Sequence, residues 1–308
     1  MNLKPAACKN PPCRLCGFNR YEVFLEDAAC ANEKKYCIIQ CKKCAFISVH
    51  PLPDHESLKE HYDSSYWKGP QQKESPYMQH FFSFRVKSIV YELTKHISRK
   101  GKILDLGAGD GAWVHLLRRK GFEAWGIDPF SIPSKTDYLI QGTLHSAEFG
   151  DSSFDAITCF HVLEHLDDPL NELKEALRIL KPGGIMIVEV PNISSWGFSL
   201  FKKNWQPLHI PAHVNHFTPE TLRQVFQTAG DVTLLKLSHF SAKTSPAAFV
   251  LSFLPGLTPQ NVRRKFDGKY PFHYKTAYLA LQMVSLPYIV PGILAQRGCI
   301  IRGYFRKL

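Results

Sequence analysis

The residues best suited to chemistry lie in one polar stretch, FHVLEHLDD, at positions 160–168. His161, Glu164 and His165 fall within five positions, directly after an apolar run from Phe154 to Phe160 that predicts a buried strand. A histidine and a carboxylate at this spacing can exchange a proton with a substrate, or they can hold a metal ion. They can also be structural, because polar residues are common where a helix begins. The cluster alone does not choose among these three roles.

Four cysteines form a second candidate site near the N-terminus. They make two C-x2-C pairs, Cys13 with Cys16 and Cys41 with Cys44, separated by 24 residues. Each pair can present two thiolates to one ion, and four thiolates complete a tetrahedral zinc site. Four thiolates leave no open position for a substrate, so we predict a structural zinc ion. Three further cysteines of this N-terminal region lie outside the pairs and are interpreted as free thiols: Cys8, Cys30 and Cys37.

Alternating glycines mark a third candidate site. Gly107, Gly109 and Gly111 follow the apolar run ILDL and precede a predicted helix at 112–120. Glycine lets a backbone approach a ligand closely, and a helix start offers unpaired N–H groups. The next predicted strand ends at Asp128, seventeen residues after Gly111, where a carboxylate can accept hydrogen bonds from two ribose hydroxyls. The pattern predicts a nucleoside-containing ligand at these strand ends.

The elements that must position these residues alternate between strands and helices. The predicted strands are 103–106, 124–127, 138–140, 154–160, 185–190 and 232–237, with helices between them, a helix at 219–229 and an amphipathic helix at about 77–97. Such alternation predicts an α/β fold with a parallel sheet covered on both faces by helices. Ligands of such sheets bind outside the carboxyl ends of the strands. The glycine loop, Asp128 and the cluster at 161–165 all follow predicted strands, so we expect them at one edge of the sheet.

Composition sets the limits of the interpretation. The chain has 308 residues, of which 44% are hydrophobic and 21% charged, which argues against a disordered chain and against a bundle of membrane helices. The first ten residues lack the apolar core of a secretory signal, so we expect a cytoplasmic protein with reduced cysteines. The net charge is +11, and residues 261–308 carry +8 of it, with nine basic residues against Asp267. A basic surface of this kind can meet nucleic acid, anionic lipid or a phosphorylated substrate, or it can simply be solvated.

The motifs together resemble the class I S-adenosylmethionine-dependent methyltransferases. The resemblance covers roughly 102–237 and rests on ordered matches: ILDLGAGDG, GIDP, SSFDAITCFHVLEHLDDP, LKEALRILKPGG with IMIVEVP, and HVNHFTPETLRQVFQTAG. The segment from CRLCG to HYDSSYW resembles the zinc-binding leader of many bacterial methyltransferases, including those that modify sugars and surface glycans. The resemblance implies a doubly wound, mostly parallel seven-stranded sheet. Dehydrogenases also use a glycine loop and an acidic strand end, but the G-x-G-x-G spacing and LKPGG argue against that class.

The resemblance implies cofactor-binding roles at the strand ends. The residues expected to line the methionine part of S-adenosylmethionine are Gly107, Ala108, Gly109 and Gly111, with Asp105 below the loop and reaching the amino group. Asp128 and Pro129 are expected at the ribose, and Thr143 and Leu144 at the adenine, where the usual acidic residue is absent. Phe160 and His161 are expected beside the cofactor.

The resemblance also places the cluster at 161–165 between cofactor and acceptor. Some ubiquinone-pathway and small-RNA 2'-O-methyltransferases use a glutamate-histidine pair, an earlier carboxylate and a later histidine to bind a divalent ion that acidifies a hydroxyl. Here Glu164 and His165 match the pair, His161 replaces the earlier carboxylate, and His216 is the best downstream match. We keep three hypotheses for these four residues: they brace the pocket, one acts as a general base, or they hold a metal.

A histidine-rich segment at 205–217 is expected to form a lid over the acceptor. It contains three histidines in eight positions, His209, His213 and His216. The aromatic residues expected to form walls of the acceptor pocket are Trp196, Trp205 and Phe217.

A hydrophobic, basic segment before the last predicted strand is not required by the core fold. Its second apolar run, 278–294, is nearly long enough to span a bilayer. Residues 298–307 are predicted to form the last antiparallel strand of the sheet, and a strand beyond a membrane could not rejoin that sheet. The segment therefore either packs on the domain or a dimer partner, or it rests on an anionic membrane surface through 245–297.

The sequence thus predicts five parts: a zinc module at 1–53, a linker with helices at 54–100, a methyltransferase core at 101–240, an insertion at 241–297 and a last strand at 298–308. We expect a methyltransferase that acts on a hydroxyl of a saccharide, a glycan precursor or a related small molecule. It would be cytoplasmic and could lie peripherally on the inner face of the membrane. One alternative is an RNA 2'-O-methyltransferase, although the basic residues cluster with apolar runs and not with the exposed aromatic residues of RNA platforms. Another is a catalytically idle module that binds cofactor or zinc in an assembly.

Overall fold

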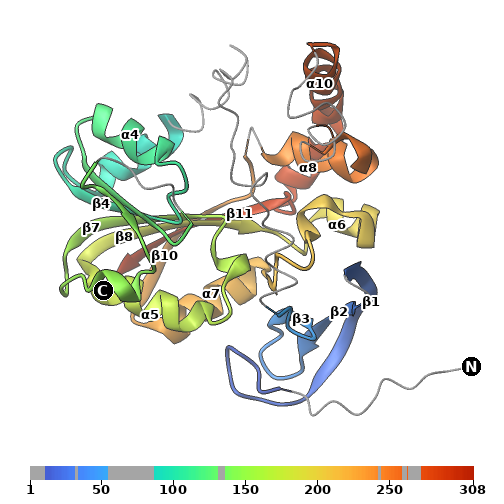
Figure 1. The fold of residues 1–308 in the computed structure, drawn as a ribbon, viewed down its shortest axis with the longest axis horizontal. Helices are drawn as coiled ribbons and strands as arrows, with labels where there is room; N and C mark the ends of the chain where they lie inside the picture. Colours follow the sequence, from blue (N-terminus) through green and yellow to red (C-terminus); the bar gives the residue numbers. More distant parts are fainter. Residues whose placement is uncertain are drawn as a thin grey trace, which may run out of the picture.

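The computed structural model describes residues 11–31, 34–54, 87–130, 136–241, 244–258, 262 and 272–308. Within these ranges the chain forms a seven-stranded sheet and a separate four-stranded sheet (Figure 1). Of the predicted helix at 77–97, residues 87–96 are helical and the earlier part lies outside the described residues. Cys8, the Cys30 side chain and the basic residues at 263–269 also lie outside them.

The seven-stranded sheet confirms the predicted α/β architecture. Its strands are β4 (Lys102–Leu106), β5 (Glu123–Asp128), β6 (Leu139–Gln141), β7 (Phe154–Phe160), β8 (Leu180–Pro191), β10 (Val232–Ser238) and β11 (Ile300–Lys307). They lie in the order β10-β11-β8-β7-β4-β5-β6. The pairs among β4 to β8 are parallel, and β11 pairs antiparallel with both β8 and β10. The chain order reverses beside β4, so the carboxyl ends of β4 and β7 meet at the point where such sheets bind ligands.

Strand β8 begins earlier than the sequence predicts. The strand was expected from Ile185, but it starts at Leu180 and includes the LKPGG segment. Gly183 adopts a positive φ of 75°, and the pairing with β7 shifts register between Phe154 and Ala156. The strand absorbs the glycines as an irregularity because this conformation costs glycine little.

Helices cover both faces of the sheet, and Figure 1 shows α4 (Ala112–Arg119) above it and α5 (Pro169–Ile179) and α7 (Pro219–Ala229) below it. The upper core includes Ile89, Leu93, Val114 and Leu117, and the lower core includes Leu173, Leu177, Leu222 and Phe226. Helix α5 starts at an Asp168 cap, and α7 starts at a Thr218–Thr221 capping box, each followed by proline. These local signals fix where each helix begins, just after the strand it follows.

The four-stranded sheet joins the cysteine region to the core. Its strands are β1 (Tyr21–Ala31), β2 (Lys34–Cys41), β3 (Ile47–His50) and β9 (Asn215–His216), in that order. Strand β9 comes from the histidine-rich segment and pairs with β3 through Ile47 opposite His216 and Ser48 opposite Asn215. The module predicted to end at residue 53 therefore shares a sheet with residues of the core.

The expected insertion before the last strand consists of helices. It contains α8 (Thr244–Phe253), a short turn η5 (Pro255–Leu257) and α10 (Phe272–Leu294). These helices lie beside α6 (Trp196–Phe201), which follows β8, and Figure 1 shows α8 and α10 at the upper right of the molecule. The last strand, β11, returns to the sheet as predicted.

Candidate functional site

The glycine loop after β4 folds back on the start of α4. Gly107 and Ala108 donate backbone hydrogen bonds to the carbonyl of Ile127 on β5. A Cβ on Gly107 would lie 2.3 Å from Cγ2 of Val162, whereas a Cβ on Gly109 would meet nothing within 4 Å. Gly107 is therefore required for packing, and Gly109, with φ of 54°, borders open space that a ligand can approach.

Two buried carboxylates lie against this loop. Asp128 is 6% exposed; its Oδ2 accepts from the Gly109 N–H at 3.0 Å and its Oδ1 from the Phe130 N–H at 2.7 Å. Asp105 is 4% exposed, and its Oδ1 accepts from the Thr158 hydroxyl at 2.7 Å. Both carboxylates thus lie at the expected strand ends, and each is held by hydrogen bonds to neighbouring groups. Pro129, next to Asp128, is exposed.

The loop after β6 carries the residues expected at the adenine. Thr143 is exposed and exchanges hydrogen bonds with Ser146, while Leu144 is 1% exposed and belongs to the lower core. The Leu144 side chain is therefore part of the core, and the predicted contact of Leu144 with the adenine would have to come from its backbone.

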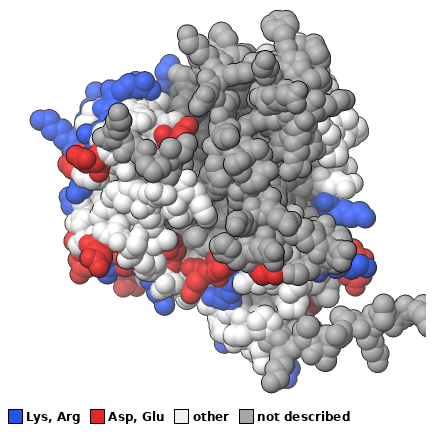
Figure 2. Space-filling view, viewed as in Figure 1, with Lys and Arg blue, Asp and Glu red and all other residues white. Residues whose placement is uncertain are grey.

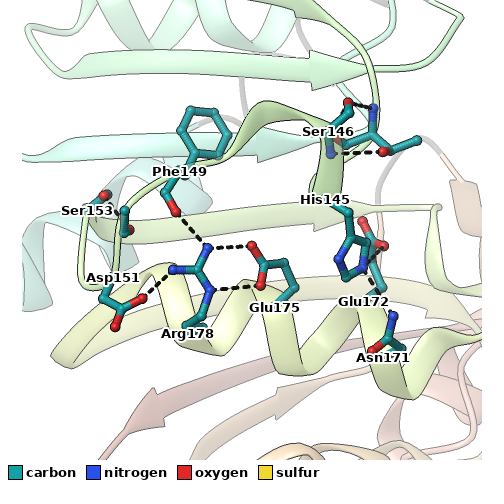
Figure 3. A network of polar contacts seen from close by, with 11 residues as sticks. His145, Ser146, Phe149, Asp151, Ser153, Asn171, Glu172, Glu175 and Arg178 are labelled. Atoms are coloured by element: carbon teal, nitrogen blue, oxygen red, sulfur yellow. Dashed lines mark hydrogen bonds and ion pairs between the residues drawn. The ribbon is translucent and has the colours of Figure 1, made fainter.

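Polar contacts to α5 anchor the loop that follows β6 (Figure 3). His145 contacts Glu172 at 3.4 Å and Asn171 at 3.3 Å. Arg178 forms a two-bond pair with Glu175, donates to the Phe149 carbonyl at 2.6 Å and binds Asp151. The segment that carries Thr143 is held to α5 at both ends.

His161 lies at the carboxyl end of β7 between two buried glutamates. Its Nδ1 is 3.1 Å from Oε1 of Glu164, and its Nε2 is 3.1 Å from Oε1 of Glu189. Glu189 in turn accepts from Nε of Arg302 at 2.7 Å. The glutamates are 1% and 0% exposed, and Arg302 is 4% exposed, so the four residues form a buried chain of alternating charge. Phe160, just before His161, packs edge-to-face on Trp113 at the mouth of the glycine loop.

The charge of His161 follows from these neighbours. Burial alone would lower the pKa of His161, but hydrogen bonds and charges from Glu164 and Glu189 outweigh burial and raise the pKa to about 9. The ring is one-third exposed at its side chain. His161 is therefore a cation at neutral pH and holds Glu164 in place, and it is unsuited to accept a proton.

Glu164, His165 and His213 form a group of possible metal ligands or proton acceptors. One ligand atom from each lies within 4.8 Å of the others. Nδ1 of His165 lies 3.0 Å from the Ala212 carbonyl and Nδ1 of His213 lies 2.8 Å from the Pro207 carbonyl. A carbonyl only accepts hydrogen bonds, so each Nδ1 carries the proton and each Nε2 keeps its lone pair. Among the described residues, Oε2 of Glu164 has no hydrogen-bond partner.

Burial keeps both imidazoles of this group neutral. It lowers the pKa of His165. It lowers the pKa of His213 well below its usual value, and the charges of neighbouring histidines lower it further. A neutral imidazole whose Nδ1–H is held by a carbonyl is the form that binds a metal ion or accepts a proton through Nε2. The chemistry of this donor set therefore fits either role.

The structure brings a different downstream histidine to this group than the one expected from the sequence. His216 lies on β9, is 2% exposed and is not a member of the group; His213 takes the place expected for it. Burial lowers the pKa of His216 to about 3. Two of the expected aromatic walls are also core residues: Phe217 packs on Phe46, and Trp205 is 2% exposed, whereas Trp196 is 47% exposed.

The sequence did not single out two residues that the structure places near this edge, and it predicted a third only as part of the lid. Glu189 and Arg302 lie within apolar strands, and His213 lies three residues before the histidine that was chosen. A carboxylate in the run IMIVEVP was the available signal, since a buried glutamate needs a partner. Its partner, Arg302, lies 113 residues later, on the last strand, so no local pattern could identify it.

The four cysteines meet as the sequence predicts. Sγ of Cys13 lies 3.5 Å from that of Cys44, and Sγ of Cys16 lies 3.7 Å from that of Cys41. Backbone hydrogen bonds from Gly17 to Cys13 and from Ala45 to Cys41 close the two turns. Sulfur atoms bound about 2.3 Å from one tetrahedral ion would be separated by similar distances, so the cluster fits a zinc ion. Cys37 lies apart and contacts the His50 carbonyl.

Comparisons with known proteins agree with this geometry. A family model described as a methyltransferase domain matches residues 78–232. A ubiquinone biosynthesis O-methyltransferase of Xanthomonas campestris pv. campestris is 32% identical over 111 residues, which cover 32% of this chain and 46% of that protein. The protein of the same name from Aliivibrio fischeri is 27% identical over 113 residues, with 32% and 48% covered. The chain spans about half the length of the curated relatives it matches.

Among solved structures, a putative sarcosine dimethylglycine methyltransferase from Galdieria sulphuraria aligns with a TM-score of 0.48 and 20% identity, over 73% of this chain and 85% of that one. The family match extends over about half of the chain and includes the glycine loop, Asp128 and the strands that carry the histidine cluster. The chain therefore belongs to the class I S-adenosylmethionine-dependent methyltransferases.

Proposed function

We propose that the protein transfers a methyl group from S-adenosylmethionine to a hydroxyl oxygen of a saccharide, a glycan precursor or a related small molecule. The observation that carries the hydroxyl acceptor is the group Glu164, His165 and His213, with two unprotonated Nε2 atoms beside the cofactor edge. The O-methyltransferase names of the relatives support an oxygen acceptor. The saccharide class rests on the resemblance of the cysteine-rich leader.

The sulfonium of the cofactor is already activated by its charge, so the protein must align the acceptor and remove its proton. The acceptor oxygen forms a bond to the methyl carbon as the carbon–sulfur bond breaks, and the sulfur leaves as a neutral thioether. The acceptor proton passes to Nε2 of His165, the more accessible of the two neutral imidazoles. His213 packs edge-to-face on His165 with ring centres 4.6 Å apart and holds its orientation.

The cofactor is expected to lie along the glycine loop. Gly109 gives it room, Asp128 and Asp105 provide acceptors for its hydroxyl and amino groups, and Phe160 borders its methyl end. His161 would hold Glu164 as a carboxylate beneath the acceptor.

Binding of a divalent cation is a second candidate role for the group Glu164, His165 and His213. The orphaned Oε2 of Glu164 and two carbonyl-oriented histidines are ligands that such an ion prefers. When bound, the ion would acidify the acceptor hydroxyl. A separate zinc ion is proposed at Cys13, Cys16, Cys41 and Cys44, in a structural role.

The test is a methyl-transfer assay against nucleotide sugars, lipid-linked glycans, small phenols and RNA. His165→Gln should lower kcat by about 100-fold or more on the accepted substrate and leave the affinity for S-adenosylmethionine unchanged. His96→Gln is the matched control and should leave kcat unchanged, because His96 contacts Arg306, which pairs with Ile185 at the edge of the sheet opposite the site. Full activity of His165→Gln would refute the assigned base, and transfer only to RNA would refute the acceptor class.

Metal content separates the two uses of the histidine group. If His165 acts as a general base, we expect one tightly bound ion per chain, at the cysteines. Turnover should then be unaffected by a chelator of magnesium and manganese. A divalent site predicts a second ion that Glu164→Gln removes, together with turnover that depends on added metal. If calorimetry detects no binding of S-adenosylmethionine, the protein is not an active methyltransferase and the catalytic proposal fails.

A further inference from the structure

Helices α6, α8 and α10 present a large exposed apolar surface, which we call the helical face. The exposed apolar residues of this region are Trp196, Leu200, Phe253, Leu254, Met283, Val284, Tyr288, Val290 and Leu294, with exposed fractions from 40% to 80%. In α10 the window Thr276–Leu294 has a mean hydropathy of 1.5 and is only 17% buried. Large contiguous apolar surfaces on soluble domains mark sites of protein or membrane interaction.

A cavity opens within the helical face. Its volume is about 290 Å³, and residues of all three helices line it, among them Trp196, Leu200, Phe249, Tyr288 and Ile293. Phe249 and Tyr288 stack with ring centres 5.9 Å apart. The lining is mainly apolar, so the cavity suits a hydrocarbon chain better than a polar ligand.

The cavity lies on the same edge of the sheet as the candidate active site. Its floor includes Gly298 and Cys299, just before β11. Asn192, directly after β8, donates to the carbonyls of both of these residues. The carboxyl end of β8, which carries Glu189, therefore leads directly to the cavity.

The charges beside the helical face are positive. Arg297 lines the cavity, is exposed, and donates to the Ser194 carbonyl and the Ser199 hydroxyl. Lys202 and Lys203 follow α6 and are exposed. Residues 241–308 contain ten basic residues and one acidic residue, Asp267. Cations around an apolar surface favour an anionic bilayer over an uncharged one.

The arrangement of the helices excludes a simple membrane span. The insertion leaves the sheet after β10 and returns to it at β11, so a helix that crossed a bilayer would need a second crossing. Helix α8 has 10 residues, about 15 Å at 1.5 Å per residue, which is half of the roughly 30 Å hydrocarbon core. The two described helices, α8 and α10, can therefore lie on a membrane, and α8 is too short to serve as the second span.

We propose that the helical face docks on an anionic lipid bilayer and that its cavity holds the hydrocarbon chain of a membrane lipid. Trp196 and Tyr288 would lie at the level of the headgroups, where aromatic side chains with a polar end are favoured. Docking would bring a lipid-linked acceptor to the carboxyl end of β8. That link to the acceptor rests on the proposed function, whereas docking itself does not.

Sedimentation of the full chain with liposomes tests the docking. We expect binding to phosphatidylglycerol liposomes at low salt, weaker binding to phosphatidylcholine, and loss of binding as salt screens the cations. Val284→Glu/Tyr288→Glu should weaken the partition constant by about tenfold or more. Val23→Glu/Tyr91→Glu is the matched control, since these side chains are 55% and 62% exposed, against 65% for both test residues. The control should bind like the unaltered protein.

Fluorescence quenching tests the cavity. Phosphatidylglycerol with brominated acyl chains should quench tryptophan fluorescence. Trp196→Phe/Trp205→Phe should remove most of the quenching, because these two tryptophans line the cavity, whereas Trp125→Phe should not. Both variants must keep the affinity of the unaltered protein for S-adenosylmethionine, which shows that they are folded.

Failure to sediment with anionic liposomes at low salt would overturn the proposal, as would equal binding by the test and control variants. A dimer in light scattering that Val284→Glu/Tyr288→Glu dissociates, without liposome binding, would show that the face joins two copies of the chain. Binding without quenching through Trp196 or Trp205 would refute the chain-filled cavity. None of these readouts requires methyl transfer, so they can fail or succeed independently of the proposed activity.

Discussion

Asp128 links the glycine loop to the end of β5 through both of its oxygens. An asparagine at this position keeps the shape of the side chain but has only one acceptor oxygen. Its NH2 group would then face the N–H of Gly109 or Phe130, so that two donors would meet without an acceptor. We expect Asp128→Asn to weaken S-adenosylmethionine binding by about tenfold, equivalent to about 1.4 kcal/mol, in titration calorimetry. Asp231→Asn, at an exposed carboxylate, is the control. Unchanged affinity of Asp128→Asn would show that the carboxylate has no part in the cofactor site.

Glu189 neutralises a buried cation on the last strand. Glu189→Gln would leave Arg302, which is 4% exposed, without a carboxylate and would remove one anion from His161. Because an unpaired buried charge is costly, we expect the free energy of unfolding to fall by about 3 kcal/mol in guanidinium titrations.

A double variant that removes both charges distinguishes the contribution of the Glu189–Arg302 ion pair from that of side-chain packing. Glu189→Met/Arg302→Met replaces the ion pair with apolar groups and should cost less than Glu189→Gln alone. If the double variant is the less stable of the two, the glutamate does not act by pairing with Arg302.

Residue types in the candidate site were predictable from sequence, but their partners were only partly so. The motif at 160–168 predicted a functional cluster, and the structure keeps Glu164 and His165 together. The choice between His213 and His216 depends on how the segment at 205–217 folds over the sheet. That path is set by the pairing of β9 with β3 and by the contact of His213 with the Pro207 carbonyl, and the histidine spacing contains neither.

At the scale of elements, Asp155 fastens the start of β7 to both of its neighbours. It accepts from the Lys102 N–H of β4 at 2.7 Å and from Nζ of Lys181 of β8 at 2.7 Å. Burial would raise the pKa of Asp155, but these donors outweigh it and lower the pKa below the usual 3.8. The ionised form is therefore favoured by folding.

The sign of the pH dependence follows from this lowered pKa. The stabilisation by Asp155 is complete above the unfolded pKa near 3.8 and is lost as the pH falls through the lower folded value. Since both side chains are partly exposed, Asp155→Asn should cost about 0.5–1 kcal/mol at pH 7. In urea titrations, the difference in unfolding free energy between Asp155→Asn and the unaltered protein should become smaller as the pH approaches 3. A difference that stays constant over this range would contradict the ionic contribution.

Periodic elements were predictable and pairings between distant segments were not. The strands at 154–160 and 232–237 and the helix at 219–229 fall within one residue of their predicted bounds, because apolar periodicity and capping residues are local signals. Strand β8 starts five residues earlier than expected, since glycines that favour a turn are also tolerated in a bulged strand. The two-residue strand β9 has no local signal; it exists because β3 provides its partner.

On the face of the molecule shown in Figure 2, the described charged side chains include both signs. On the face shown in Figure 2, the described Lys and Arg side chains lie at the margins, and acidic side chains alternate with them along the lower edge. The net charge of +11 therefore does not form a broad positive field over the described atoms of that face.

The cysteine module and the candidate active site are joined through one short segment. Val214 donates from its backbone to the Glu164 carbonyl and accepts at its own carbonyl from the Val49 N–H of β3. Asn215 donates to the carbonyls of Leu163 and Leu166, which flank Glu164 and His165, and it accepts from Arg14 of the first cysteine turn. Order in the cysteine module therefore bears on the position of the catalytic group.

This coupling predicts a selective loss of turnover when zinc is removed. Cys41→Ser/Cys44→Ser should lower the zinc content from one ion per chain to none, since two thiolates cannot hold the ion as four do. Methyl transfer should fall by about tenfold or more, because the support of Glu164 and His165 is weakened. The affinity for S-adenosylmethionine should change by less than about twofold, since the hydrogen bonds described above link the module to the segment of Glu164 and His165. Cys37→Ser, a change at a cysteine outside both pairs, is the control and should keep zinc and turnover. Full activity without zinc would show that the module and the active site are independent, and equal loss of cofactor binding would show that the whole core, and not the acceptor side alone, depends on the metal.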